Sequence, residues 1–190
     1  MYDINKSREI YSILNAGKII NRNTLNNAGE LMDNALFIEL MDNLTHYREI
    51  YNGLGYKLID NVDYFYLNDL NSSDNDNLAV KIQILLIVIG KYVNQQGYLL
   101  NRIYPQSTGL SADDFDRMSE IENLQEILER LKIHANLKSK DLKETIKKVL
   151  VDRGVMFEKP LSGNFVLADS GMDFFKRIQK YTTATTEITS

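Results

Sequence analysis

The sequence of 190 residues contains no cysteine, no tryptophan, two prolines and two histidines. Without cysteine, a disulfide scaffold, a thiolate zinc site and a cysteine nucleophile are all excluded. Two isolated histidines, His46 and His134, are too few for a metal site built on imidazole ligands, so we expect no metal. Hydrophobic residues make up 44% of the chain, which is enough to bury the core of one ordinary domain or of two small ones.

Long apolar runs and targeting segments are also scarce. The most apolar stretch, residues 84–89, is only six residues long, whereas a helix needs about 20 residues to span a bilayer. The first residues lack the basic and apolar regions of a signal peptide. The sequence therefore predicts a cytoplasmic protein with no membrane partner.

The net charge of −4 is distributed unevenly along the chain. Residues 1–79 hold 6 basic and 12 acidic residues, whereas residues 80–190 hold 16 basic and 14 acidic ones. Within the second part, residues 113–129 hold seven acidic side chains and residues 130–153 hold eight basic ones. This segregation indicates either separate surfaces for separate partners or ordinary solvated helix faces.

The beginning of the chain predicts two helices. Ser7 is placed to cap a short helix that ends before Gly17. Asn27 with Glu30 resembles the capping box of a second, longer helix. The apolar residues of that helix recur at spacings of three and four: Leu31, Met32, Ala35, Leu36, Leu40, Leu44 and Tyr47. Such spacing is typical of a helix with one face against a core.

Two short strands, 56–60 and 64–67, follow these helices. They are rich in aromatic and β-branched residues and flank an Asn/Asp turn, which is the pattern of a hairpin. We interpret Gly53 and Gly55 as a helix stop and a turn, because they lack the third glycine and the Gly-Lys-Ser/Thr of phosphate-binding loops. The polar, turn-prone residues 68–77 indicate a linker and place the domain boundary.

The second part of the chain repeats the order of helices and then a hairpin. Three helices and two strands are expected in this order: 78–98, 121–131, about 139–152, 155–159 and 164–167. The two strands would turn at Gly163. A last helix, capped by Ser170, follows them, and the threonine-rich end from Thr182 is expected to be disordered.

Helices followed by a hairpin are the order of a winged helix, a helix-turn-helix variant with a β wing. The predicted fold class is therefore mainly α with small β-hairpins (α+β), arranged as tandem winged-helix domains. The N-terminal domain would span residues 1–75 and serve dimerisation and protein contact. The C-terminal domain would span residues 76–181, followed by a disordered tail at 182–190.

The helix expected over 139–152 carries a lysine face. At 100° per residue its apolar residues gather on one side and its lysines on the other. In a winged helix this is the recognition helix, where lysines are positioned for phosphates. The candidate DNA contacts are Lys138, Lys140, Lys143, Lys147, Lys148, Arg153 and Lys159. Because lysine is a mobile point charge, we expect weak, salt-sensitive and sequence-tolerant DNA binding, with a solvated face or an acidic protein partner as alternatives.

Tyrosine is abundant, with 11 in the chain. Five of them lie in one stretch of twenty residues within the acidic first part: Tyr47, Tyr51, Tyr56, Tyr64 and Tyr66. Tyrosine combines an apolar ring with a polar tip, which suits a half-buried interface. We predict that these five belong to a protein interface, with ordinary core and hairpin packing as the alternative for two or three of them.

The sequence contains no recognisable catalytic constellation. The carboxylates at 113–129 follow a polar surface pattern, whereas a general acid needs a pocket that raises its pKa. The segment 74–77 resembles the start of a calcium loop, but the loop's glycine and final glutamate are missing. We therefore predict no enzyme activity, no catalytic residue and no cofactor. A metal-dependent transferase or nuclease at 113–129 is the weakest alternative.

Several segments together resemble the MukE/MksE family. In the first part they are Tyr-Arg-Glu-Ile-Tyr-Asn-Gly-Leu-Gly-Tyr-Lys-Leu at 47–58 and Tyr-Phe-Tyr-Leu at 64–67. In the second part they are Asp-Arg-Gly at 152–154, Asn-Phe-Val-Leu at 164–167 and Gly-Met-Asp-Phe-Phe at 171–175. Family members are the kleisin-interacting tandem winged-helix (kite) subunits of bacterial condensin-like SMC complexes. The likeness covers about residues 8–180 and is closer to MksE than to MukE.

The resemblance implies a homodimer that forms largely through the first winged helix and holds a segment of the kleisin (MukF/MksF-like). The kleisin bridges the heads of the SMC ATPase (MukB/MksB-like), which supplies the nucleotide chemistry. It also implies a nucleoid-associated role in DNA entrapment, for chromosome organisation or plasmid defence. The alternative is a free-standing winged-helix DNA-binding protein, such as a transcription regulator or plasmid replication initiator.

Overall fold

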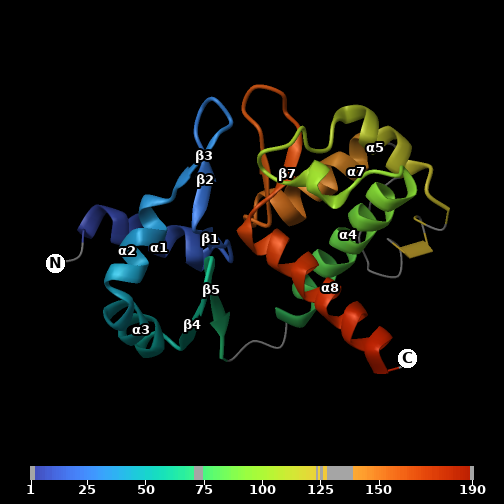
Figure 1. Cartoon of the computed structure of the whole chain (residues 1–190). Coiled ribbons are helices and arrows are strands. Elements are labelled where there is room, and N and C mark those ends of the chain that lie inside the picture. Colours follow the sequence, from blue (N-terminus) through green and yellow to red (C-terminus); the bar gives the residue numbers. More distant parts are fainter. Residues whose placement is uncertain (1–2, 71–74, 123, 125, 128–138, 189–190) are drawn as a thin grey trace.

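The computed structural model describes residues 3–70, 75–122, 124, 126–127 and 139–188. Two groups of helices and strands lie side by side (Figure 1). We call residues 3–70 the N-terminal lobe and the described residues from 75 onward the C-terminal lobe. Helices dominate and the sheets are small and antiparallel, so the predicted α+β class is confirmed.

The N-terminal lobe contains, in chain order, α1 (Ile4–Asn15), β1 (Ile20–Asn21), β2 (Asn23–Leu25), β3 (Leu31–Asp33), α2 (Ala35–Asp42), α3 (Leu44–Gly53), β4 (Tyr56–Asn61) and β5 (Tyr64–Asp69). The predicted hairpin is confirmed as β4 and β5, and β1 extends it to a three-stranded antiparallel sheet of order β1-β5-β4. Helix α1 ends before Gly17 as expected, but its cap is Asp3 rather than Ser7. The Asp3 carboxylate accepts hydrogen bonds from the first free amides of the helix.

The long helix predicted after Asn27 is wrong in its first part. Residues 23–33 form the β2–β3 hairpin instead, and helix begins only at α2, where Asn34 is the N-cap. In the hairpin turn, the Asn26 side chain accepts hydrogen bonds from two backbone amides, one of them that of Glu30. Asn27 with Glu30 resembles a capping box, but the neighbouring Asn26 closes this turn, because short polar side chains close turns as readily as they cap helices.

The C-terminal lobe contains α4 (Asn75–Gln95), the 3₁₀ turn η1 (Leu100–Ile103), α5 (Ala112–Ser119), α7 (Ser139–Ile146), the π-helical turn η2 (Lys147–Val151), β6 (Met156–Glu158), β7 (Phe165–Leu167) and α8 (Asp169–Ile188). The predicted first helix is confirmed as α4, the third as α7 continued by η2, and the hairpin as β6 and β7. Most of the helix predicted over 121–131 lies outside the described residues.

Two features of the C-terminal lobe differ from the prediction. Helix α5 was not expected; Ser111 caps it in a capping box with Asp114. Helix α8 continues to Ile188, so residues 182–188 are helical where a disordered tail was predicted. After Gly171 this helix contains no glycine or proline, so no helix-ending residue precedes residue 182.

The two lobes share a connection pattern. In the N-terminal lobe the short strand β1 pairs with the last hairpin strand, Ile20 opposite Phe65. In the C-terminal lobe Leu110 forms an isolated bridge with Phe165 of β7, through hydrogen bonds of 2.8 and 2.9 Å. Each lobe thus contains a first helix, a short extended segment, further helices and a final hairpin whose last strand pairs with that segment. The N-terminal lobe has the β2–β3 hairpin in addition.

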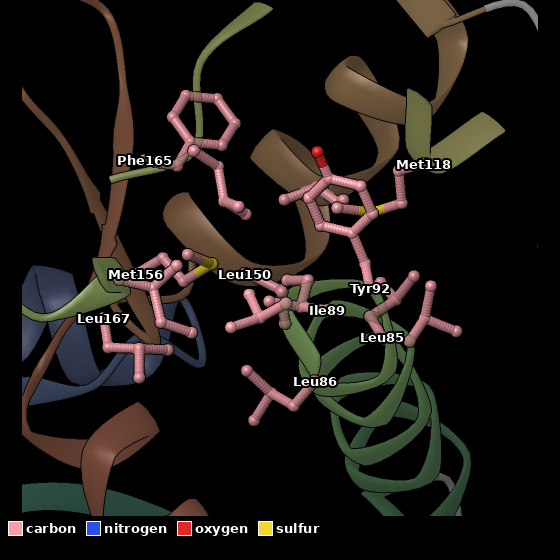
Figure 2. Packing of buried hydrophobic residues seen from close by; sticks show 14 of the residues in the cluster. Leu85, Leu86, Ile89, Tyr92, Met118, Leu150, Met156, Phe165 and Leu167 are labelled. Atoms are coloured by element: carbon pink, nitrogen blue, oxygen red, sulfur yellow. The ribbon is translucent and has the colours of Figure 1, made fainter. Parts of the chain in front are cut away.

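Helix α4 forms the centre of the C-terminal core. Figure 2 shows Ile89 of α4 beside Leu150 of η2, with Met156 and Leu167 of the hairpin beyond Leu150 and Leu85 on the other side of the helix near Tyr92. Residues 78–95 of α4 are long and apolar enough to cross a membrane by length and composition alone. One third of this stretch is buried, and its buried side chains pack in the C-terminal core, so the apolar composition of this helix does not by itself indicate a membrane span.

Candidate DNA and protein interfaces

The lysines of α7 and η2 have partners within the C-terminal lobe. The Lys147 ammonium lies 2.7 Å from the Glu158 carboxylate of β6, and this hydrogen-bonded ion pair raises the pKa of Lys147. The Lys143 ammonium lies over the Phe165 ring, 5.6 Å from its centroid. Lys148 is exposed. The β6–β7 hairpin therefore packs against the helix and occupies part of the predicted lysine face.

The remaining candidate DNA contacts lie in different places. The Lys159 ammonium donates a hydrogen bond of 2.6 Å to the Ser107 carbonyl. The Arg153 guanidinium donates to the Ala16 carbonyl, in the other lobe. Lys140 belongs to the first turn of α7, and Lys138 lies outside the described residues. Lys143, Lys147 and Lys148 thus lie together on α7 and η2. Arg153 and Lys159 instead donate hydrogen bonds to backbone carbonyls elsewhere in the protein.

Two of the five candidate tyrosines belong to the core of the N-terminal lobe. The side chains of Tyr47 and Tyr51 are 3% and 2% exposed and lie in its apolar cluster. Burial raises the pKa of both phenols. The Tyr47 hydroxyl lies 2.7 Å from the Ser7 hydroxyl. For these two residues the alternative, ordinary core packing, describes what the structure shows, because both side chains are buried.

The other three tyrosines are half-buried. Tyr64 and Tyr66 stack with ring centroids 6.2 Å apart, and the Tyr64 hydroxyl donates a hydrogen bond of 2.9 Å to Asp173 of α8. Tyr56 lines an open groove of about 560 Å³ between α3 and β4. An ion pair of 2.7 Å between Arg48 and Asp60 lies at this groove. Tyr56 and Tyr66 are therefore the candidates that remain near accessible surface.

In the described part of the acidic segment 113–129, one carboxylate is buried and the others are exposed. Asp114 is buried, where its carboxylate accepts hydrogen bonds from the Tyr92 hydroxyl at 2.7 Å and from Arg102 at 3.1 and 2.9 Å. Its neighbours Asp113 and Asp116 are exposed. Across the part of the chain that the structure describes, there is no group of three or more His, Asp or Glu side chains able to hold a metal ion.

The comparison with protein families covers both lobes. The family model described as condensin complex protein MksE matches residues 5–179. The chain belongs to the MksE family. No curated protein matches it. The resemblance seen in the sequence is thus confirmed at the level of the family, and membership of a condensin complex implies partners within an SMC-type assembly.

A polar junction that the sequence does not reveal joins the two lobes of this MksE-family protein. The buried Asn21 side chain donates a hydrogen bond of 2.7 Å to the Gly154 carbonyl and accepts one of 3.0 Å from the Ser170 amide. Asn23 donates to the Asp169 carboxylate through its amide (2.8 Å) and its side chain (3.0 Å). These residues are far apart in the sequence, and no local motif marks them.

The backbones of the two lobes also meet directly at this junction. The Ile19 amide donates a hydrogen bond of 2.9 Å to the Arg153 carbonyl. Gly154 adopts a φ of +79°, and a Cβ there would lie 2.8 Å from the Ile19 carbonyl oxygen. We call residues 16–23, 153–154 and 169–173, with Tyr64, the lobe junction. Its close approach requires glycine at 154.

Proposed function

We propose that this protein is a non-enzymatic accessory subunit of a bacterial SMC complex that forms a homodimer, binds the kleisin and contributes to DNA entrapment. The observation that carries the proposal is the match to the condensin complex family over residues 5–179. The repeated connection pattern of the two lobes supports tandem winged-helix domains. A cytoplasmic, nucleoid-associated location follows from this role, and the family match favours it over a free-standing DNA-binding regulator.

The surface of the N-terminal lobe supports protein contact. Large apolar side chains are exposed on its helices and loops; four of them lie on α2 (Ile38 and Met41), on α3 (Ile50) and at the residue that follows α3 (Leu54). Exposed apolar groups gathered on neighbouring helices are typical of sites that meet another protein. The acidic character of this part disfavours nucleic acid as its partner.

The proposed assembly can be tested by co-expression with the kleisin of the same genome. We expect the purified chain to elute as a dimer of 21.9 kDa subunits in size-exclusion chromatography with light scattering, and to retain the kleisin. The SMC ATPase should join only when the kleisin is present, because contact with it is proposed to run through the kleisin. A stable monomer that does not retain the kleisin would contradict the proposal.

Weak DNA binding is proposed for the exposed side of α7 and η2. Replacing Lys143 and Lys148 with glutamine removes two charges for which no ion pair is seen among the described residues. Because each lysine–phosphate contact releases counterions, the slope of log affinity against log salt should fall by roughly one to two in magnitude. Fluorescence anisotropy with a random-sequence duplex measures this slope.

The matched control replaces Lys81 and Lys91 of α4 with glutamine, which makes the same change of charge on another helix. The control should keep the slope of the unmodified protein. Equal slopes for the unmodified protein and the α7–η2 variant would remove this face from the proposal. A sequence-specific footprint with nanomolar affinity at physiological salt would instead favour the free-standing DNA-binding protein.

A further inference from the structure

The contacts across the lobe junction are almost entirely polar. The apolar clusters of the two lobes are separate, and Ile19 is the one side chain described in the N-terminal lobe that packs against the C-terminal cluster. The broadest contacts between described helices and strands all lie within a lobe. Separating the lobes would therefore expose little apolar surface, which is the term that makes unfolding of a core costly.

The hydrogen bonds of the junction can be exchanged for bonds to water. Each such exchange costs little net free energy, because water replaces the lost partner. Burial raises the pKa of Asp169 above its ordinary value, against the lowering effect of its hydrogen bonds from Asn23. The ionised carboxylate is thus better solvated in an open junction than in the closed one.

An outer contact lies beside this buried group. The Asp173 carboxylate of α8 accepts the hydrogen bond from the Tyr64 hydroxyl and forms an ion pair of 2.7 Å with Arg177. The Arg177 side chain is 57% exposed, and exposed pairs of this kind contribute little to stability. The outer contact therefore helps to orient α8 against Tyr64 in the closed junction, but it adds little to the free energy needed to open it.

We propose that the lobe junction is a latch, closed in this structure, that opens without unfolding either lobe. Opening breaks the bonds of Asn21, Asn23 and Arg153 together, because all three join the same short segments. Arg153 lies two residues after the end of η2, so opening changes the position of the η2 lysines relative to the N-terminal lobe. Under the proposed function, this sets the spacing between the protein-binding lobe and the lysine face, whereas the latch itself is independent of that function.

Hydrogen exchange of the unmodified protein tests the latch directly. Three backbone amides donate across the junction: Ile19, Asn23 and Ser170. We expect these three to share one opening free energy and to exchange roughly 100-fold faster than the amides of Phe165 and Tyr51, which require unfolding of a lobe. Exchange of all three as slow as that of Phe165, or three unrelated rates, would overturn the proposal.

Distance measurements between spin labels give a second test. The chain has no cysteine, so Glu49→Cys and Asp113→Cys place one label on an exposed position of each lobe. Dilution with unlabelled protein isolates the distance within one chain. In otherwise unmodified protein one distance should dominate, and adding Asn21→Ala with Asp169→Ala should raise the ratio of open to closed molecules by about tenfold or more.

The matched control for this variant is Asn94→Ala with Asp116→Ala, which removes the same side chains from exposed positions on α4 and α5. The control should keep the single distance. An unchanged distance in the junction variant, with native circular dichroism, would refute the latch. Loss of helical signal in that variant would refute it as well, because the junction would then belong to the folding core of a lobe.

Discussion

Replacing Asp114 with alanine is expected to lower the free energy of unfolding of the C-terminal lobe by about 3–5 kcal/mol. Asp114 is 2% exposed, and both of its carboxylate oxygens accept hydrogen bonds from the same nitrogen of Arg102, Nη2. It also accepts hydrogen bonds from Tyr92 and from the amide and hydroxyl of Ser111, which caps α5. The substitution leaves the Arg102 charge without its partner and removes half of the capping box. Urea denaturation followed by circular dichroism measures the loss.

Asp113→Ala is the matched control, because the exposed Asp113 precedes Asp114 in the same first turn of α5. Its cost should stay within about 0.5 kcal/mol, as for other surface substitutions. Equal stabilities of the two variants would show that the Asp114 network contributes no more than a surface charge does.

The same network predicts a dependence of stability on pH. Burial opposes ionisation of Asp114, but hydrogen bonds from Ser111 and Tyr92, together with Arg102, outweigh it and hold the pKa of the carboxyl below its ordinary 3.8. A depressed pKa in the folded state means that the carboxylate stabilises the protein above pH 3.8. This contribution is lost as the pH falls through the folded-state value, so Asp114→Asn should flatten the acid side of the stability profile.

The helix ends and hairpins could be predicted because their signals are local. Gly97, after α4, and Gly163, in the β6–β7 turn, have φ of +67° and +66°, a conformation that glycine adopts at little cost. The aromatic and β-branched residues beside each turn specify strands without reference to the rest of the chain. These features depend on a few neighbouring residues, which the sequence shows directly.

The β2–β3 hairpin could not be predicted by the same reasoning. Leu31 and Met32 fit the helical spacing of the residues that follow them, so periodicity alone extends the helix backwards. In the structure Thr24 lies opposite Met32 and Leu25 opposite Leu31, with Met32 itself half exposed. The pairing with a neighbouring strand decides the conformation here, and an apolar residue in a strand need not face a core.

The surface assignments depended on tertiary contacts between distant residues. Lys147 is paired with Glu158 of the hairpin, and Arg153 reaches a carbonyl 137 positions away, so neither is the free charge that helical spacing suggests. The bond from Asn21 to Gly154 joins residues 133 positions apart. A charge pattern shows which side of a helix is polar, whereas only the packing of other elements decides which polar groups remain available.

Replacing Tyr51 with alanine is expected to destabilise the N-terminal lobe by about 3–5 kcal/mol, the usual cost of removing a buried aromatic ring. The side chain is 2% exposed and lies in the cluster with Leu40, Leu58 and Phe65. Removing it leaves a cavity that this small core fills only in part. Tyr51→Phe keeps the ring and should cost less than about 1.5 kcal/mol.

Tyr66→Ala is the surface counterpart, because its half-buried ring lies on the opposite side of β5 from Phe65. We expect thermal melting to show a large loss for Tyr51→Ala and a small one for Tyr66→Ala. Tyr51→Ala should lose the kleisin only to the extent that the N-terminal lobe unfolds. Tyr51→Phe should retain the kleisin. If Tyr51→Ala melted like the unmodified protein and yet lost the kleisin, Tyr51 would belong to the interface after all, and its place in the core would not explain its role.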